Sequence, residues 1–511
     1  DGLPVDCYKE MSREQLELVL KMLNEWLEGA PIPEELTNAQ VILLHKKGDK
    51  NNLENYRPIS LLNANYKIFT TILQKRLADC LDKHLQKTQY GFRRNRGTAQ
   101  ALHYVRRVME KGERTRTKTL FVLLDWEKAF DKVIHDKIYE TLERMNVPPK
   151  IVNVIKNLYK KPKFKVELEG YESEWTQQRT GIRQGCPLSP YLFVIVMSCL
   201  FHDIHEQDRM NMEEHRIQGT HCDQVLYADD TICMSEDEDA MERLVHAIEK
   251  EGKQYGLRLN QTKCEYLYFG DARKLKFSNG SPIPVCKNAK YLGANINNRG
   301  DPAAEVTRRI RDCMATLNKL HVYFYNSDNS VTRKLQMFNA ILRSKVMYGL
   351  ETLAMNQSIK DKLDTFQLKC LRKILRIPTT YVNREFSNSH VRTQVNHKLQ
   401  EAKKKPMITL SEYHKRTRVA YLARLITAGN EDPGTPITFH ADSLKPIDHG
   451  KLRVGQPRVH WYKTTLEDIW IKTKQKIPTV KYASVFNHNA PAHVSAIKEY
   501  CATLVKSHKT H

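Results

Sequence analysis

The chain has 511 residues and a formal net charge of +23 at neutral pH. With 41% hydrophobic and 28% charged residues it can bury large cores, which excludes a disordered chain, and at roughly 150 residues per domain the length predicts three or four structural units. The longest nearly unbroken apolar run, 191–201, is about half of the ~20 residues that a membrane helix needs, so we expect no membrane span. The positive charge favours a polyanionic partner, first nucleic acid and second an anionic membrane surface.

Helices and strands alternate over the first 300 residues. The apolar periodicity predicts a helix over 12–28, a strand over 41–44, a helix over 65–85 and a basic helix over 98–115 that we expect Gly112 to interrupt. After them we expect a strand over 119–124, a helix over 136–145, a hairpin within 164–180, a helix capped by Ser189, a hairpin over 223–234, a helix over 239–255, and strands near 264–269 and 290–296.

The pattern changes near residue 300. From 303 onward it is helical and basic, which indicates a new domain. Beyond 377 the signal weakens, proline and histidine become frequent, and we expect short helices and a frayed tail over 506–511.

The cysteines indicate a reducing compartment. The 11 cysteines are scattered and form no CxxC pair, which argues against a disulfide framework or a zinc ribbon. Cys199, His202 and His205 drift around a predicted helix, and with His221 and Cys222 they match no zinc-finger spacing. We therefore interpret these side chains as structural.

Three acidic residues lie where strands end or turn. Asp125 ends one apolar strand, and Asp229 and Asp230 occupy the turn of a hairpin about 100 residues later. Neighbouring carboxylates repel one another and need a cation, and phosphoryl transfer through two Mg²⁺ ions needs hard oxygen ligands on rigid strands. The alternative for the Asp-Asp pair alone is an ordinary exposed turn, which the apolar strands on both sides disfavour.

A series of motifs accompanies these acids in a characteristic order. They are Asn55-Tyr56-Arg57-Pro58-Ile59-Ser60-Leu61-Leu62, Gln89-Tyr90-Gly91-Phe92-Arg93, Asp125 with Ala129-Phe130-Asp131, Gly181-Ile182-Arg183-Gln184-Gly185-Cys186-Pro187-Leu188-Ser189-Pro190, Tyr227-Ala228-Asp229-Asp230, Gly256-Leu257 with Asn260 and Lys263, and Tyr291-Leu292-Gly293. With this set, residues 1 to about 300 closely resemble the reverse transcriptases of non-LTR (LINE-type) retrotransposons.

The resemblance implies an α+β fold with the right-hand polymerase architecture. We expect an N-terminal extension and fingers over 1–118, a palm with an antiparallel sheet over 119–285, and a fingers insertion at about 150–182. A primer grip and helical thumb should follow over 286–376, then a basic, mainly helical region over 377–511.

The resemblance also implies catalytic and metal-binding roles. Asp125 and Asp229 would ligate two Mg²⁺ ions, with Mn²⁺ able to substitute. Asp230 would support the cluster, and the Trp126 backbone carbonyl would complete a coordination sphere. Phe130 would lie under the incoming sugar and reject a 2′-hydroxyl, although it can also pack in the core.

By the same resemblance, Lys46, Arg57, Gln184, Gly185 and Lys263 would contact the nucleotide. Alternatives remain open for each. The match to the family motif does not decide between Lys46 and Lys47, and their turn can also be a solvated loop. The loop 183–185 can simply lead into a helix. Lys263 can be an exposed strand lysine.

Template and primer contacts are expected mainly in the thumb. The resemblance implies such contacts for Arg93, Tyr291, Leu292, Gly293, Arg308 and Arg311. The thumb helices also carry Arg309, Lys319, Lys369, Arg372, Lys373 and Arg376, which would track duplex phosphates or form a solvated face. Trp461, after the basic segment 453–458, either stacks on a base or anchors a helix, and we favour the anchor.

The implied function is RNA-directed DNA synthesis from dNTPs on an RNA template. It would start at a nicked DNA target and take place in the nucleus, and the number of copies of the chain is left open. Because the chain starts at Asp1, we expect it to begin inside a longer reading frame, with an endonuclease upstream or lost. The alternatives are a domesticated, non-catalytic RNA- or DNA-binding remnant, which the intact acids disfavour, and an RNA-dependent RNA polymerase, which Phe130 disfavours.

Overall fold

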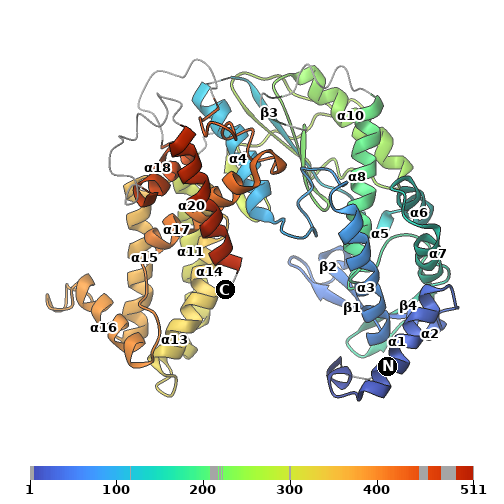
Figure 1. Cartoon of the computed structure of the whole chain (residues 1–511), viewed down its shortest axis with the longest axis horizontal. Helices are drawn as coiled ribbons and strands as arrows, with labels where there is room; N and C mark the ends of the chain where they lie inside the picture. Colours follow the sequence, from blue (N-terminus) through green and yellow to red (C-terminus); the bar gives the residue numbers. More distant parts are fainter. Residues whose placement is uncertain are drawn as a thin grey trace.

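The computed structural model describes residues 5–115, 117–207, 217, 220, 223–297, 301–447, 459–473 and 491–509. The chain forms an arch with two arms (Figure 1). One arm holds the N-terminal helices and a first sheet, and the other holds helices from the second half of the chain. A four-stranded sheet and helix α4 (Thr98–Thr115) lie between the arms at the top of the arch.

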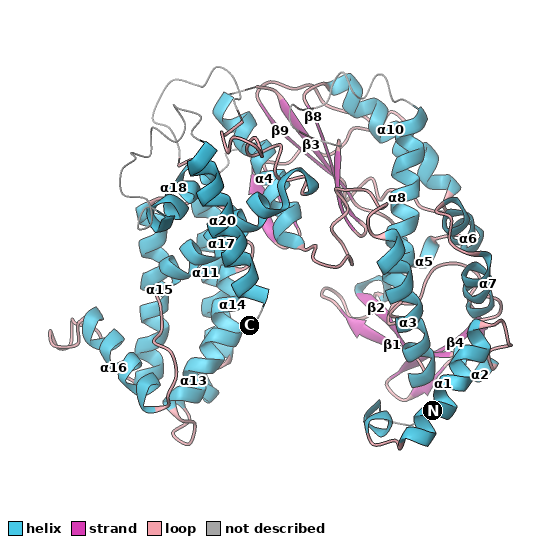
Figure 2. Cartoon of the chain, in the orientation of Figure 1, coloured by secondary structure: helices cyan, strands magenta, loops and turns pink. Residues whose placement is uncertain are grey.

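The sheet of the N-terminal arm combines two distant segments. Strand β1 (Ala39–His45) pairs antiparallel with β2 (Tyr56–Leu61) and parallel with β4 (Lys163–Leu168). The short strands β5 (Tyr171–Glu172) and β6 (Thr176–Gln177) then pair with β4, which forms the expected hairpin region. Figure 2 shows these strands beside α3 (Ala64–Leu81) and α1 (Arg13–Leu27). Residues 163–177 therefore belong to the same sheet as β1 and β2, although more than 100 positions separate them in the sequence.

The central sheet has the order β7-β8-β3-β9, with all neighbours antiparallel. The strands are β7 (Gln224–Tyr227), β8 (Asp230–Ser235), β3 (Thr119–Leu124) and β9 (Glu265–Phe269). Every residue of β3 is buried because both faces are covered. Alternate residues of β3 join the core that includes α8 (Ser189–Gln207) and α10 (Glu238–Gln254), and the others join the core that includes α4. This double cover fixes the position of the strand that ends at Asp125.

Helix α4 continues through Gly112, so the expected interruption there is wrong. A Cβ atom at this position would come within 2.6 Å of the Thr119 Oγ1 atom at the start of β3. The glycine therefore permits close contact between helix and strand, and packing outweighs its weak helix propensity.

The second arm begins with a hairpin. Strands β10 (Asn288–Tyr291) and β11 (Ala294–Asn297) lead into α11 (Pro302–Lys319). Helices α13 (Val331–Met337), α14 (Ser344–Met347) and α15 (Gln357–Leu375), with a π-helical stretch over Phe338–Arg343, complete a separate hydrophobic core that also takes in α16 (Asn388–Glu401).

The C-terminal helices are longer than expected. Helices α17 (Leu410–Ala428) and α20 (Pro491–Lys509) each have 19 residues, and α18 (Trp461–Thr473) has 13, so the expectation of short helices is wrong. The helix α20 also includes most of the expected frayed tail. Helix α17 packs against α15, α18 and α20 and buries residues on several sides, which leaves little amphipathic periodicity in its sequence.

The C-terminal region is docked on α4. His103 of α4 hydrogen-bonds Thr438 over 3.0 Å, and Gln100 donates to Asp432 over 2.9 Å. The Trp461 side chain is fully buried, and its indole N–H donates to the Glu351 carbonyl over 2.8 Å. Trp461 therefore anchors the start of α18, as favoured from sequence, whereas the neighbouring segment 453–458 lies outside the described residues.

The remaining elements are short or peripheral. No helix in the described part of the chain is both long and apolar enough to cross a bilayer. The remaining elements are η1 (Val5–Lys9), α2 (Glu34–Thr37), η2 (Leu53–Asn55), α5 (Ala129–Lys132), α6 (His135–Arg144), α7 (Pro149–Leu158), α12 (His321–Tyr325), η4 (Leu350–Thr352) and η5 (Gly429–Glu431).

Candidate active site

The three acids converge at one edge of the central sheet. Leu124, the last residue of β3, pairs with Thr231 of β8, so one further step of this antiparallel register sets Asp125 opposite Asp230. Asp229 lies in the two-residue turn between β7 and β8. The backbone N–H of Asn260 donates to the Asp125 carbonyl over 2.8 Å, which ties the end of β3 to the segment before β9. Residues 104 and 105 positions apart along the chain thus share one edge.

The acids influence each other's ionisation. Partial burial raises the pKa of the Asp125 carboxyl, and burial raises the pKa of Asp229, with a further contribution from the Asp125 charge. Burial, followed by the charges of Asp229 and Asp125, raises the pKa of Asp230 to about 6. The side chains of Asp229 and Asp230 still reach solvent, so an ion can approach them. Such mutual repulsion is what a bound cation would relieve.

Three basic side chains from separate elements surround this cluster. Lys263 and Lys46 counteract the rise in the pKa of Asp125, and Arg57 counteracts that of Asp229. Lys46 follows β1 and Arg57 lies on the neighbouring strand β2, where it pairs with Leu44. The electrostatic partners of Asp125 and Asp131 include Lys46 and not Lys47. This favours Lys46 in the open choice of register.

The donor chemistry of the cluster fits a divalent metal, but the side chains are not pre-arranged as a complete metal site. Three carboxylates are the hard oxygen ligands that Mg²⁺ prefers. Within the described residues, however, no group of three or more acidic, histidine or cysteine side chains could hold an ion as it stands. Asp125, Asp229 and Asp230 are the residues that would hold such an ion.

Trp126, expected to offer its backbone carbonyl, is fixed firmly next to Asp125. Its side chain is buried, and its indole N–H donates to the Thr231 hydroxyl over 3.2 Å. Trp126 also forms an isolated bridge with Leu259. The backbone that carries Asp125 is therefore held between β8 and the segment before β9.

Phe130 is partly buried five residues after Asp125. Its ring stacks on Phe193 of α8, with centroids 4.6 Å apart, and meets Phe92 edge-on at 6.4 Å. Packing in the core and contact with a bound sugar are compatible, because one face of the ring is supported while the residue as a whole remains half-exposed.

The loop 183–185 docks onto the N-terminal sheet. The Ser60 N–H of β2 donates to the Gln184 carbonyl over 2.7 Å. Gly185 has a φ of +127°, and a Cβ atom there would lie 2.4 Å from the Ser60 carbonyl oxygen. The structure therefore explains Gly185 by its close approach to β2, a reason that sequence reasoning did not identify, while Gln184 remains half-exposed.

Arg93 occupies a structural position instead of facing a nucleic acid. It is buried, and its guanidinium forms an ion pair with Asp82 at 3.0 Å and donates to the carbonyls of Gln86 and Gln89. These bonds hold together the loop between α3 and α4. The expected template contact is not supported by this geometry, because the donors that would bind phosphate are already used.

The expected primer-grip hairpin is held by the first helix after it. Tyr291 is buried and its hydroxyl has no partner among the described residues, whereas Leu292 and Gly293 form a turn with positive φ. The Gly293 carbonyl accepts from Arg308 and Arg309, and the Leu292 carbonyl accepts from Tyr348. This places the turn at the junction of the two arms.

Several thumb cations have partners within the fold. Arg308 pairs with Glu305 and Asp312, and buried Arg309 pairs with Glu305 at 2.5 Å. Arg372 and Arg376 donate to carbonyls of neighbouring loops. The expectation that several of these residues track phosphates or form a solvated face is therefore wrong for buried Arg309, whereas Arg311, Lys319 and Lys369 are exposed.

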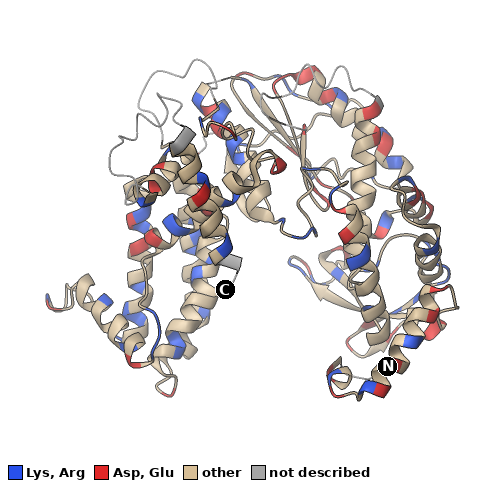
Figure 3. Cartoon of the chain, in the orientation of Figure 1, with Lys and Arg blue, Asp and Glu red and all other residues tan. Residues whose placement is uncertain are grey.

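Charge is not gathered in one patch. Figure 3 shows Lys and Arg spread over both arms with acidic residues among them. The positive net charge of the chain therefore does not by itself locate a binding face.

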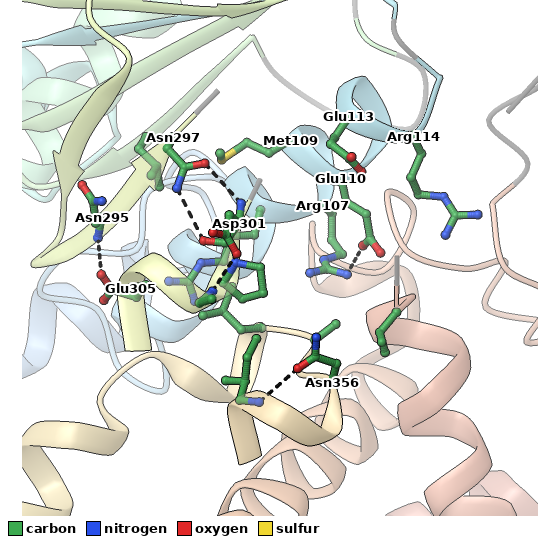
Figure 4. Close-up of a pocket in the computed structure, with 18 residues that line it drawn as sticks. Arg107, Met109, Glu110, Glu113, Arg114, Asn295, Asn297, Asp301, Glu305 and Asn356 are labelled. Atoms are coloured by element: carbon green, nitrogen blue, oxygen red, sulfur yellow. Dashed lines mark hydrogen bonds and ion pairs between the residues drawn. The ribbon is translucent and has the colours of Figure 1, made fainter. Parts of the chain in front are cut away.

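A deep cavity of about 490 Å³ lies elsewhere, between α4, β11 and the starts of α11 and α15 (Figure 4). None of Asp125, Asp229 and Asp230 lines it. Two of its acidic side chains have partners, because Glu110 forms an ion pair with Arg107 and Glu305 accepts the Asn295 backbone N–H over 3.0 Å. We therefore place the candidate active site at the carboxylate edge and not in this cavity.

The cysteine and histidine residues considered for zinc have other surroundings. Cys199 is buried in α8, His202 lies 3.7 Å from Asp203, and His205 hydrogen-bonds Gln224. His221 and Cys222 lie outside the described residues.

An antiparallel sheet that presents three acids at one edge, beside lysine and arginine from a second sheet, defines a polymerase of the right-hand class. Residues 44–296 match the family "Reverse transcriptase (RNA-dependent DNA polymerase)". The chain is 25% identical over 461 residues to the "RNA-directed DNA polymerase from mobile element jockey" of Drosophila melanogaster, which covers 85% of this chain and 48% of that protein. Residues 44–296 therefore form a reverse transcriptase domain, and the chain is similar to the polymerases of non-LTR, LINE-type retrotransposons.

Other relatives agree with this assignment. The chain is 26% identical over 314 residues to the "Retrovirus-related Pol polyprotein from type-1 retrotransposable element R2" of Nasonia vitripennis, which covers 59% of this chain and 30% of that protein. The chain thus spans about half the length of the jockey protein and less of the R2 polyprotein.

Solved telomerase structures show a distant likeness. Apo telomerase from Candida tropicalis has a TM-score of 0.42 and 13% identity, over 81% of this chain and 72% of that one. Telomerase from Candida albicans with a telomeric RNA fragment has a TM-score of 0.44 and 10% identity, over 73% of this chain and 68% of that one. Below a TM-score of 0.5 the likeness supports no conclusion about this chain.

Proposed function

We propose that this chain is an RNA-directed DNA polymerase that copies retrotransposon RNA into DNA by metal-dependent nucleotidyl transfer. The observation that carries the proposal is the convergence of Asp125, Asp229 and Asp230 at one sheet edge, with Lys46, Arg57 and Lys263 around them. Carboxylates that raise one another's pKa, together with nearby cations, suit a site that holds metal ions and a triphosphate.

The residues would divide the work as follows. Two divalent ions, when bound, supply activation of the primer 3′-hydroxyl and neutralise charge on the triphosphate and leaving pyrophosphate. Asp125 and Asp229 would hold them, and Asp230 would lower the local potential further. Lys46 and Arg57 would bind triphosphate oxygens, because an ammonium and a planar guanidinium both recognise phosphate. Phe130 would restrict the sugar to deoxyribose.

The proposed substrates are an RNA template, a DNA primer and dNTPs. Priming from a nicked genomic target would require the protein to act in the nucleus. The similarity of the chain to the polymerases of mobile elements supports this route.

Primer extension on an RNA template with Mg²⁺ tests the proposal. Wild-type protein and an Asp229→Ala/Asp230→Ala double variant are each given dNTPs or rNTPs, and duplex binding is measured at several salt concentrations. DNA product from the wild type alone, and only from dNTPs, is expected. Equal duplex binding without extension by either protein would instead favour the non-catalytic remnant, and RNA product would favour an RNA polymerase.

A further inference from the structure

The turn that presents Asp229 contains a strained residue. Tyr227 pairs with Asp230, so Ala228 and Asp229 form the two-residue turn, and Ala228 has a φ of +58°. This left-handed conformation is uncommon for alanine and costs free energy on the order of 1 kcal/mol unless neighbouring contacts hold it.

The side chain of Gln89 supplies those contacts. Its Oε1 atom accepts the Ala228 N–H over 3.0 Å and the Gly91 N–H over 2.9 Å. Gln89 is fully buried, and its Nε2 atom has no partner among the described residues. Its side chain therefore acts through the acceptor oxygen. One atom thus links the turn to the loop before α4.

The backbone around Gln89 reinforces this link. Tyr90 N–H donates to the Leu226 carbonyl over 2.9 Å, and Leu226 N–H donates to the Thr88 carbonyl over 3.0 Å. A Cβ atom on Gly91 would lie 2.4 Å from the Ala228 nitrogen, so only glycine permits this approach. The segment 88–91 therefore lies beside β7, to which Gln89 is joined by an isolated parallel bridge with Leu226, and it ends against the turn.

We infer that Gln89 is a positioning residue of the active site: its side-chain oxygen holds Ala228 in the left-handed conformation that aims Asp229 and Asp230 at the metal-binding edge. Gln89 touches neither substrate nor metal. Glutamine provides the acceptor without charge, whereas glutamate would add a fourth negative charge beside three carboxylates. This inference rests on the proposed function for its kinetic consequence but not for its structural one.

Gln89→Met in the full chain removes the acceptor at similar volume. We expect hydrogen–deuterium exchange of peptides over 224–232 to become faster and Mn²⁺ binding, followed by electron paramagnetic resonance, to weaken. We also expect kcat for primer extension to fall by about 100-fold, as for a small misplacement of catalytic groups. The KM for dNTP and the affinity for duplex should change little, because no binding residue is removed.

Gln367→Met is the matched control. Gln367 is equally buried but lies in α15, where its amide donates to the Ile408 carbonyl. The Gln367→Met variant should lose about as much stability as Gln89→Met. Its hydrogen–deuterium exchange over 224–232 and its affinity for Mn²⁺ should stay unchanged. If Gln89→Met behaves like this control, the inference is overturned.

Two further outcomes are informative. If Gln89→Met does not fold, it is combined with Ala228→Gly, because glycine adopts the left-handed conformation without support. The double variant should regain folding, and failure to regain it would reject the inference. If the wild type does not extend primers, the proposed function fails, but the exchange and Mn²⁺ measurements still decide whether Gln89 positions the turn.

Discussion

The Phe130 ring stacks on Phe193 with centroids 4.6 Å apart, which ties a residue five positions after Asp125 to helix α8 of the core. The stack fixes the orientation of Phe130, so its accessible side can act as a rigid barrier. A barrier of this kind separates sugars by a steric contact with the 2′-hydroxyl.

Phe130→Val should therefore weaken the discrimination between dNTPs and rNTPs. Loss of the ring leaves room for a 2′-hydroxyl, and we expect the ratio of kcat/KM for dNTP over rNTP to fall by at least about tenfold. The ratio cancels any loss of folded enzyme, because both nucleotides are measured on the same preparation. An unchanged ratio would reduce Phe130 to a core residue.

Asp125→Asn should abolish most of the activity. Removing a metal-ligating charge is expected to lower kcat on the order of 10³-fold, since the ion stabilises charge in the transition state. Glu127→Gln is the matched control, because Glu127 is exposed two residues away and affects Asp125 only through its charge. Primer extension by this control should stay within about twofold of wild type, and a loss equal to that of Asp125→Asn would contradict the assignment.

The ionisation of Asp230 should couple metal binding to pH. Its pKa of about 6 without metal means that protons compete with Mg²⁺ as the pH falls below about 6, so more Mg²⁺ should be needed at pH 5.5 than at pH 7.5. Activity titrations with Mg²⁺ at the two pH values measure this shift. An identical requirement at both would exclude Asp230 from the metal-linked cluster.

The same pKa predicts a stability effect in the metal-free protein. A carboxyl whose pKa is raised on folding binds protons better in the folded state, so its penalty is full above about pH 6 and fades as the pH falls towards 4. Asp230→Asn should therefore raise the melting temperature at pH 7.5 without metal and have little effect near pH 4. The exposure of the side chain limits the gain to about 1 kcal/mol or less. A lower melting temperature for the variant at pH 7.5 would contradict this sign.

Lys46 and Lys47 provide a direct comparison of neighbouring lysines. Both are exposed after β1, but only Lys46 is an electrostatic partner of Asp125. Lys46→Ala should raise the KM for dNTP about tenfold, equivalent to ~1.4 kcal/mol of binding, whereas Lys47→Ala should leave it nearly unchanged. Steady-state kinetics at saturating template and primer decide between them, and the reverse result would move the register by one residue.

Trp461→Ala should destabilise the whole chain without acting through RNA contact. The buried indole packs against His103 and Arg107 of α4, so we expect a loss of about 3–5 kcal/mol in the free energy of unfolding. Trp175→Ala is a control on an exposed tryptophan and should cost well under 1 kcal/mol. Chemical denaturation measures both, and similar small losses would show that the C-terminal region is not coupled to α4.

Local sequence was sufficient to place the strands that carry Asp125 and the Asp229-Asp230 turn. Apolar runs and turn residues are local features, because they depend only on residues close together in the sequence. The strand β3, the β7–β8 hairpin and helix α11 therefore lie close to where they were expected. The family resemblance, and not the local pattern, predicts that Lys46, Arg57 and Lys263 act together. In the structure Lys263 and Lys46 counteract the rise in the pKa of Asp125 that burial causes, and Arg57 counteracts that of Asp229, while their contact with a nucleotide stays a prediction.

Only the tertiary structure shows which polar side chains already have partners inside the fold. Arg93 and Arg309 look like phosphate ligands in the sequence, yet Asp82 and Glu305 bind them inside the fold. Gln89 gives no local signal, because its partner Ala228 is 139 positions away. Helix α17 has little periodicity because it is buried on several sides. Sequence patterns report short-range geometry, whereas the pairing of a buried charge or amide depends on which distant segment folds against it.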